Sequence, residues 1–133
     1  MGAFLSVDET QKLLYIRFEG EVTDEVFLSR YRQVLEWNAA EKYELSVTDL
    51  TGIVSSSVSS QAVRAAAERV PVIPGERRRT IVVAPNDMDF GLSRMFEMLR
   101  SAGREQFHVV RSMAEAYKLL GVESLELKTV MEW

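Results

Sequence analysis

A serine-rich segment contains the residues best suited to chemistry in this sequence. It lies between an apolar run that ends near Asp49 and a helical pattern that begins at Ser59. Its serines are Ser55, Ser56, Ser57, Ser59 and Ser60. A serine hydroxyl at the start of a helix can cap the helix, bind an anion beside the free N–H groups, or accept a phosphate. Capping is the commonest of these roles, and the other two stay open.

Few other residues are suited to catalysis. Asp49 could ligate a metal or polarise a serine, but a carboxylate at a strand end more often accepts hydrogen bonds from loop amides. His108 is the only histidine, and it lies inside the apolar run Phe107–Val110, which suits a sheet residue better than a proton shuttle. The sequence has no cysteine, so thiolate ligands and cysteine nucleophiles are excluded. We therefore expect no enzyme, no metal site and no cofactor.

Two further groups of residues are candidates for binding. Arg77, Arg78 and Arg79 form the densest basic cluster, which suits a phosphate or phospholipid head group, or simply a solvated loop. Phe90 and Met98 lie off the apolar stripe of a predicted helix. They are either ordinary surface residues or part of a dimer interface or an acyl-chain pocket.

Length and composition predict one soluble domain spanning residues 1–133. Hydrophobic residues make up 47% of the chain and charged residues 27%, as in globular proteins. The net charge of -4 argues against a nucleic-acid partner. No apolar run reaches the length of a transmembrane segment, and no secretory leader is visible. The lack of cysteine fits a reducing compartment, so we expect a cytoplasmic protein.

Apolar runs rich in β-branched and aromatic residues predict the strands. We expect Gly20 to end the second strand and Thr51-Gly52 to end the third. The fourth run, Thr80–Ala84, does not alternate apolar with polar residues, which is typical of a strand covered on both faces. The predicted strands are Phe4–Val7, Leu13–Phe18, Glu44–Leu50, Thr80–Ala84 and Phe107–Val110.

Four segments have helical periodicity. They run from a Thr23 cap to about Asn38, from Ser59 to Val70, from Met88 to Ala102, and from a Ser112 capping box to Gly121. The expected buried stripe of the third helix is Met88, Leu92, Met95, Phe96 and Leu99.

The order β-β-α-β-α-β-α-β-α predicts an α/β fold. We expect a single mixed, mostly parallel sheet of about five strands with four helices. We also expect Ser46–Asp49, Ile81–Val83 and Phe107–Val109 to be neighbouring or near-neighbouring parallel strands in one sheet. The tail, residues 122–133, could form an extra strand, a short helix or an arm that binds a neighbouring molecule.

This order, with Asp49-Leu50-Thr51-Gly52 before the serines, resembles the STAS domain of bacterial anti-sigma-factor antagonists. The run Ala84-Pro85-Asn86-Asp87 and its continuation from Phe90 to Glu97 are similar to a subfamily of small "SpoIIAA-like" bacterial proteins, which are related in fold to CRAL-TRIO lipid-binding domains. The resemblance extends from about Leu13 to Gly121.

In the antagonists, a serine at the start of the second helix is phosphorylated by the partner anti-sigma factor, which is a kinase. The resemblance places Ser59 at that position, with Ser60 beside it. The family pattern Asp-Ser-Ser-Gly-Leu is replaced here by Ser57-Val58-Ser59-Ser60-Gln61, which lacks the flanking aspartate and glycine. The resemblance thus supports the fold more strongly than the phosphorylation switch.

The resemblance implies a non-enzymatic regulatory or interaction domain with a protein partner such as an anti-sigma kinase. The alternative, implied by the CRAL-TRIO kinship, is a protein that binds a lipid or another small apolar ligand. We also expect a homodimer with Phe90, Met98 or the tail at its interface. Covering an exposed phenylalanine is worth about 1.5–3 kcal/mol, and most soluble oligomers are symmetric dimers.

Overall fold

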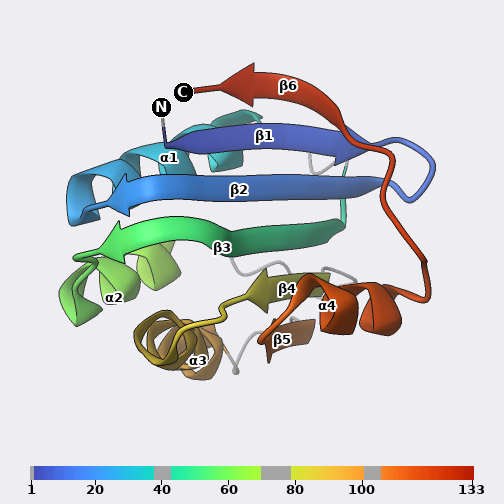
Figure 1. The fold of residues 1–133 in the computed structure, drawn as a ribbon. Helices are drawn as coiled ribbons and strands as arrows, with labels where there is room; N and C mark the ends of the chain where they lie inside the picture. Colours follow the sequence, from blue (N-terminus) through green and yellow to red (C-terminus); the bar gives the residue numbers. More distant parts are fainter. Residues whose placement is uncertain (1, 38–42, 70–78, 101–105) are drawn as a thin grey trace.

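The computed structural model describes residues 2–37, 43–69, 79–100 and 106–133. Within these ranges the chain forms one sheet and four helices (Figure 1). The strands are β1 (Ala3–Asp8), β2 (Leu13–Val22), β3 (Leu45–Ser56), β4 (Arg79–Val83), β5 (Gln106–Val110) and β6 (Lys128–Glu132). The helices are α1 (Asp24–Trp37), α2 (Ser60–Arg69), α3 (Asp87–Arg100) and α4 (Met113–Leu120).

The strands lie in the order β5-β4-β3-β2-β1-β6. Strands β2 to β5 are parallel to one another, whereas β1 is antiparallel to both β2 and β6. The predicted mixed, mostly parallel sheet is therefore confirmed, with six strands instead of about five. The three segments expected to be neighbouring or near-neighbouring parallel strands lie in β3, β4 and β5, so this prediction is confirmed.

Local capping chemistry places the helices where the sequence predicts them. The Thr23 Oγ1 atom accepts a hydrogen bond of 3.2 Å from the Val26 N–H at the start of α1. Ser112 accepts one of 3.2 Å from the Glu115 N–H at the start of α4. Gly121 closes α4 in the left-handed region, with φ 71°. The helix ends expected at Asn38, Val70 and Ala102 lie outside the described residues.

Successive side chains of a strand point to opposite faces of the sheet, so the buried residues form one core on each face. Leu14, Ile16 and Phe18 of β2 belong to a core on the face covered by α1. Leu13 and Tyr15 belong to a second core on the opposite face, which α4 covers. Figure 1 shows α1 and α2 on one side of the sheet and α4 on the other.

Strands β2 and β3 run further than the sequence predicts, because their glycines form bulges and not strand ends. Strand β2 continues through Gly20, which has φ 70°. The register between β2 and β3 shifts twice along this stretch. A Cβ atom on Gly52 would lie 2.9 Å from Arg17 Nη2 and 3.0 Å from the backbone carbonyl oxygen of Phe18, so this bulge favours glycine. The prediction that Gly20 and Thr51-Gly52 end their strands was therefore wrong.

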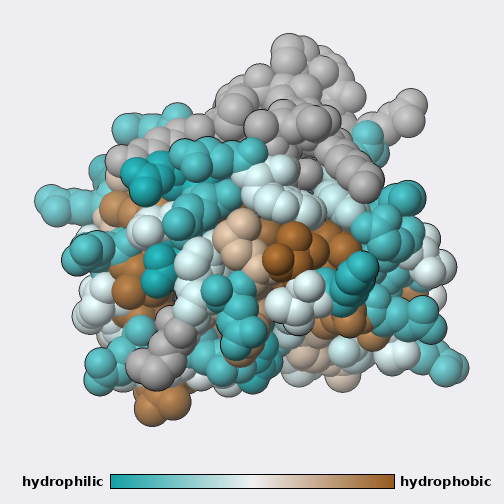
Figure 2. All heavy atoms as spheres, turned by 90° about the horizontal axis from the view of Figure 1, so that it is seen from above, coloured by the Kyte–Doolittle hydropathy of each residue, from teal (hydrophilic) through white to brown (hydrophobic). Residues whose placement is uncertain are grey.

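The C-terminal tail forms the extra strand that was one of three predicted possibilities. Strand β6 pairs antiparallel with β1, and Trp133 N–H donates to the Ala3 carbonyl at 3.0 Å. The buried Asp8 carboxylate accepts from the Glu126 N–H at 2.9 Å and so anchors the segment before β6. Figure 2 shows the molecule from above this edge of the sheet, where hydrophobic side chains gather between hydrophilic ones.

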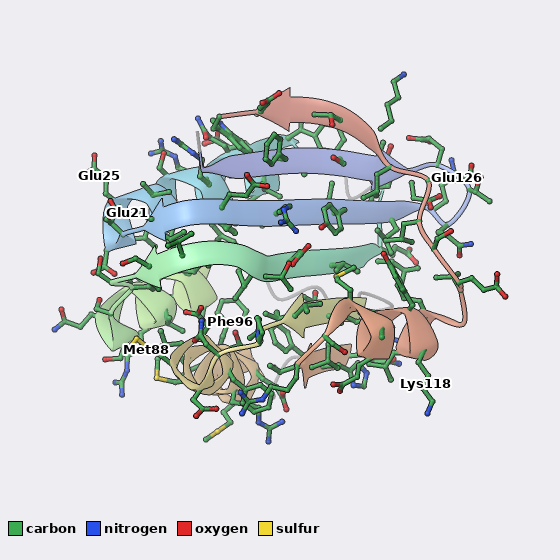
Figure 3. All side chains as sticks on the ribbon, viewed as in Figure 1. Glu21, Glu25, Met88, Phe96, Lys118 and Glu126 are labelled. Carbon is green, nitrogen blue, oxygen red and sulfur yellow. The ribbon has the colours of Figure 1, made fainter. Side chains whose placement is uncertain are left out.

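Helix α3 is rotated relative to the predicted stripe. Asp89 and Ser93 are buried, with 4% and 9% exposed, whereas Met88 and Leu99 are 63% and 47% exposed. Figure 3 shows Met88 at the outer side of the helix. The prediction that Met88 and Leu99 are buried was therefore wrong. The ring of Phe96 explains the rotation, because it packs at 5.4 Å from the ring of Phe107 on β5.

Candidate functional site

Ser59 caps α2 and is fully engaged in hydrogen bonds. Its Oγ atom accepts from the Ala62 N–H at 3.1 Å. Its hydroxyl donates to Asp24 Oδ2 at 2.7 Å, and its backbone N–H donates to Asp24 Oδ1 at 2.6 Å. These two bonds from Ser59 lower the pKa of Asp24. The geometry is that of the structural cap expected from the sequence.

The other serines do not form one cluster with Ser59. Ser55 and Ser56 belong to β3, and the predicted loop shrinks to the residues between β3 and α2. Ser57 and Ser60 are exposed on either side of the cap. Phosphorylation of Ser57, Ser59 or Ser60 stays a prediction.

Asp49 lies within β3 and not at its end, and it is 1% exposed. Its carboxylate accepts from the Thr51 N–H and from Arg17 Nη1, each at 2.8 Å, and from the Tyr15 hydroxyl. Burial alone would raise the pKa of Asp49, but these hydrogen bonds and the Arg17 charge outweigh it and lower that pKa. Burial and the Asp49 carboxylate raise the pKa of Tyr15.

This Asp49 cluster is separate from the serines. Asp49 pairs in register with Arg17 and shares the sheet face of Val47, which belongs to the core beneath α4. Ser59 lies at the start of α2, on the other side of the sheet (Figure 1). The structure therefore does not bring the Asp49 carboxylate to a serine hydroxyl.

The predicted basic cluster is only partly described. Arg77 and Arg78 lie outside the described residues. Arg79 is the first residue of β4, and its Nη2 atom donates to the Leu119 carbonyl at 3.0 Å. This contact ties β4 to the end of α4. His108 lies in β5, paired in register with Ile81, as expected of a sheet residue.

Phe90 is half-buried, and an arginine provides part of its cover. The Arg111 guanidinium lies 3.9 Å from the centre of the Phe90 ring. The same guanidinium donates to Asp87 Oδ1 at 2.8 Å. Met98 is 67% exposed. Neither Phe90 nor Met98 is among the residues that line the cavity described next.

A cavity of about 450 Å³ lies between the sheet and helices α1, α2 and α3. Most of its lining is apolar. The sheet contributes Leu14, Ile16, Phe18, Leu50, Ile53, Val82 and Phe107, and the helices contribute Phe27, Tyr31, Val34, Leu35, Val63, Leu92 and Phe96.

Aromatic rings in this lining form a continuous chain of contacts from β2 to β5. Phe18 contacts Phe27 of α1, and Phe27 stacks on Tyr31 at 5.9 Å. Tyr31 meets Phe96 edge to face at 6.0 Å, and Phe96 packs against Phe107. Phe96 is labelled in Figure 3, beside α3. The i,i+4 spacing of Phe27 and Tyr31 was visible in the sequence, but their partners across the cavity were not.

Polar side chains form the smaller part of the cavity lining. Asp89 and Ser93 contribute from one face of α3, one turn apart. On the sheet, Ser46 Oγ donates to Thr80 Oγ1 at 3.2 Å. The predicted buried stripe of α3 did not include Asp89 or Ser93, so sequence reasoning missed both.

Within the described ranges, no three His, Asp or Glu side chains are grouped so that they could hold a metal ion. No helix in the described part of the chain is long and apolar enough to cross a membrane.

No family model and no curated protein matches this sequence. The structure is similar to the crystal structure of an uncharacterised protein of the DUF3478 family from Shewanella loihica PV-4, which has a SpoIIAA-like fold. The TM-score is 0.56 with 15% sequence identity, covering 90% of this chain and 94% of that chain. An identity this low bears on the fold and not on the activity. The six-stranded mixed sheet with four helices described above is therefore a SpoIIAA-like fold.

Proposed function

We propose that this domain is a non-enzymatic binding protein whose ligand is a small, mainly apolar molecule. The observation that carries the proposal is the cavity of about 450 Å³ between the sheet and helices α1 to α3. Its volume lies within the range of roughly 300–1,000 Å³ that is usual for small-molecule sites. The alternative inferred from the CRAL-TRIO kinship thus becomes the leading function.

The character of the lining supports an apolar ligand. Aromatic and aliphatic side chains from four strands and three helices converge on the cavity, including Phe18, Phe27 and Phe96. Side chains that face a cavity lose dispersion contacts on that side. A ligand that fills the space restores those contacts, so binding is favourable without many hydrogen bonds.

A regulatory domain switched by phosphorylation of Ser59 is less well supported. The Ser59 hydroxyl donates directly to the Asp24 carboxylate. A phosphate on Ser59 would place close to two negative charges against Asp24 and break this contact. Binding to a protein partner remains the second candidate function, and the exposed α3 side chains Met88, Met98 and Leu99 offer it a surface.

Binding of the neutral fluorescent dye Nile red tests the proposal directly. We expect saturable binding to the native protein, because the dye is apolar and carries no charge. A cavity-filling variant, Leu92→Trp, should weaken this binding by about tenfold or more, which corresponds to roughly 1.4 kcal/mol. Leu92 lines the cavity and is half-buried.

Met98→Trp is the matched control, because Met98 lies on the same helix, is exposed and does not line the cavity. This variant should bind the dye as the native protein does. The proposal fails if the native protein does not bind the dye. It also fails if a folded Leu92→Trp variant binds the dye as well as the control does.

A further inference from the structure

The charged side chains among the described cavity-lining residues are all carboxylates. They are Glu36 and Glu44, which are exposed, and Asp89, which is 4% exposed. No lysine, arginine or histidine is found among the described lining residues. The described lining thus offers acceptors to a polar group of the ligand, but no cation to pair with an anion.

The buried Asp89 carboxylate has a fixed position in the first turn of α3. Asn86 Nδ2 donates to Asp89 Oδ2 at 2.6 Å, and the Asp89 N–H donates to Asn86 Oδ1 at 2.8 Å. Among the described residues, none forms an ion pair with Asp89.

Ser93 adds a second polar group to the same wall of the cavity. It lies one turn after Asp89 and is 9% exposed. Its hydroxyl can either donate or accept a hydrogen bond. The apolar side chains of Leu92 and Phe96 line the cavity around this pair. The cavity therefore combines a mainly apolar lining with a buried polar pair on α3.

We infer that the ligand carries a head group that donates hydrogen bonds and has no negative charge, such as an alcohol or an amine on an apolar chain. This inference rests on the proposed function. A hydroxyl or ammonium group donates to Asp89, and a bond to a charged acceptor is stronger than one between neutral groups. A carboxylate head group would instead face Asp89 as a like charge away from bulk water, which is unfavourable.

A matched series of ligands with one chain length tests the inference. The series is dodecanol, dodecylamine and dodecanoate, used in displacement of Nile red at neutral pH. Dodecanol is kept below its solubility limit, and the two ionic members are kept below their micelle-forming concentrations. We expect dodecanol and dodecylamine to bind the native protein about tenfold more tightly than dodecanoate. The alcohol and the amine show whether a hydroxyl or an ammonium group is the preferred donor.

Substitution of Asp89 shows whether that carboxylate is the source of the selectivity. In Asp89→Asn we expect tighter binding of dodecanoate. The ratio of its dissociation constant to that of dodecanol or dodecylamine should then fall to within about threefold. Asp87→Asn is the control, because Asp87 is in the same turn but its side chain is 97% exposed. This variant should keep the native ratio, and an equal change in both variants would contradict the role of Asp89.

Failure of this inference and failure of the proposed function give different results. If Nile red binds the native protein and dodecanoate displaces it as well as dodecanol or dodecylamine does, the head-group inference is overturned while the cavity function stands. If neither the dye nor any member of the series binds, both are overturned. The comparison on native protein decides the matter even if Asp89→Asn does not fold.

Discussion

Ser59 gives both its backbone N–H and its hydroxyl to the carboxylate of Asp24, at 2.6 and 2.7 Å. The two residues are 35 positions apart in the sequence. Asp24 begins α1 and Ser59 caps α2, so this contact joins the N-terminal ends of two helices that border the cavity. Ser59, which the resemblance places at a phosphorylation position, is thus engaged in a structural contact with Asp24.

Removal of the Ser59 hydroxyl should destabilise the fold. In Ser59→Ala, both the cap of α2 and the hydroxyl bond to Asp24 are lost. We expect the free energy of unfolding to fall by about 1 kcal/mol, the usual cost of losing a helix cap. Urea denaturation at neutral pH measures the change.

Ser60→Ala is the control for this prediction. Ser60 is exposed and adjacent to the cap, so its substitution should change the free energy of unfolding by less than about 0.5 kcal/mol. Equal effects of the two substitutions would show that the Asp24 contact contributes nothing to stability.

The buried Asp49 carboxylate should make stability depend on pH. In Asp49→Asn the charge-assisted bonds from Arg17 and Tyr15 are weakened, so we expect a loss of about 2 kcal/mol at neutral pH. The pKa of Asp49 is lowered in the folded protein, so its contribution is fully present above the unfolded value of about 3.9. That contribution disappears as the pH falls through the lower, folded pKa.

Urea denaturation of the native protein and Asp49→Asn across acid pH checks the sign. The difference in free energy of unfolding between the two should be constant from neutral pH down to about pH 5 and should shrink below about pH 4. A difference that grows on acidification contradicts the lowered pKa. Asp87→Asn serves as the control, since its ion pair with Arg111 is exposed and worth little.

Gly52 should be far less tolerant of alanine than Gly91 is. A Cβ atom on Gly52 would lie 2.9 Å from Arg17 Nη2 and 3.0 Å from the Phe18 carbonyl oxygen, which is part of the backbone. We expect Gly52→Ala to cost about 1–3 kcal/mol, as other overpacking substitutions do.

Gly91 lies within α3, and a Cβ atom there would meet no atom within 4 Å. Gly91→Ala should therefore stabilise the protein by about 0.5–1 kcal/mol, because glycine weakens a helix interior. Thermal or urea denaturation of the two variants gives the comparison. Similar effects of both would contradict the close approach at the β2–β3 bulge.

The expected homodimer stays a prediction, and we now expect its interface on α3 and not at the tail. Strand β6 pairs within its own sheet, and Arg111 covers part of Phe90. The most exposed apolar side chains on α3 are Met88 and Met98. We expect light scattering to show a dimer for the native protein and a monomer for Met98→Asp, because a charge at the interface opposes association.

Val54→Asp is the control for the dimer prediction, because Val54 is also exposed but lies on β3. It should leave the dimer intact. A native protein that is monomeric at every concentration tested would show the dimer prediction to be wrong.

The sequence by itself determined those elements that depend on interactions between residues close together in the chain. Thr23, Ser112 and Gly121 mark helix ends through bonds to residues a few positions away, so their roles were predictable. The β-branched run around Ile81–Val83 indicated a strand covered on both faces, and this strand lies second from the sheet edge. These features follow from residue type and spacing alone.

Only the tertiary structure decided the features that depend on distant partners. The sequence predicted that Gly20 and Gly52 end their strands. In the structure both strands continue, and the glycines lie at the bulges in the pairing of β2 with β3. The rotation of α3 comes from Phe96 packing on Phe107, and it turns Asp89 inward against the usual rule that charged residues face water. Hydrophobic periodicity detects an apolar face, but it cannot detect a cavity whose wall includes a buried carboxylate.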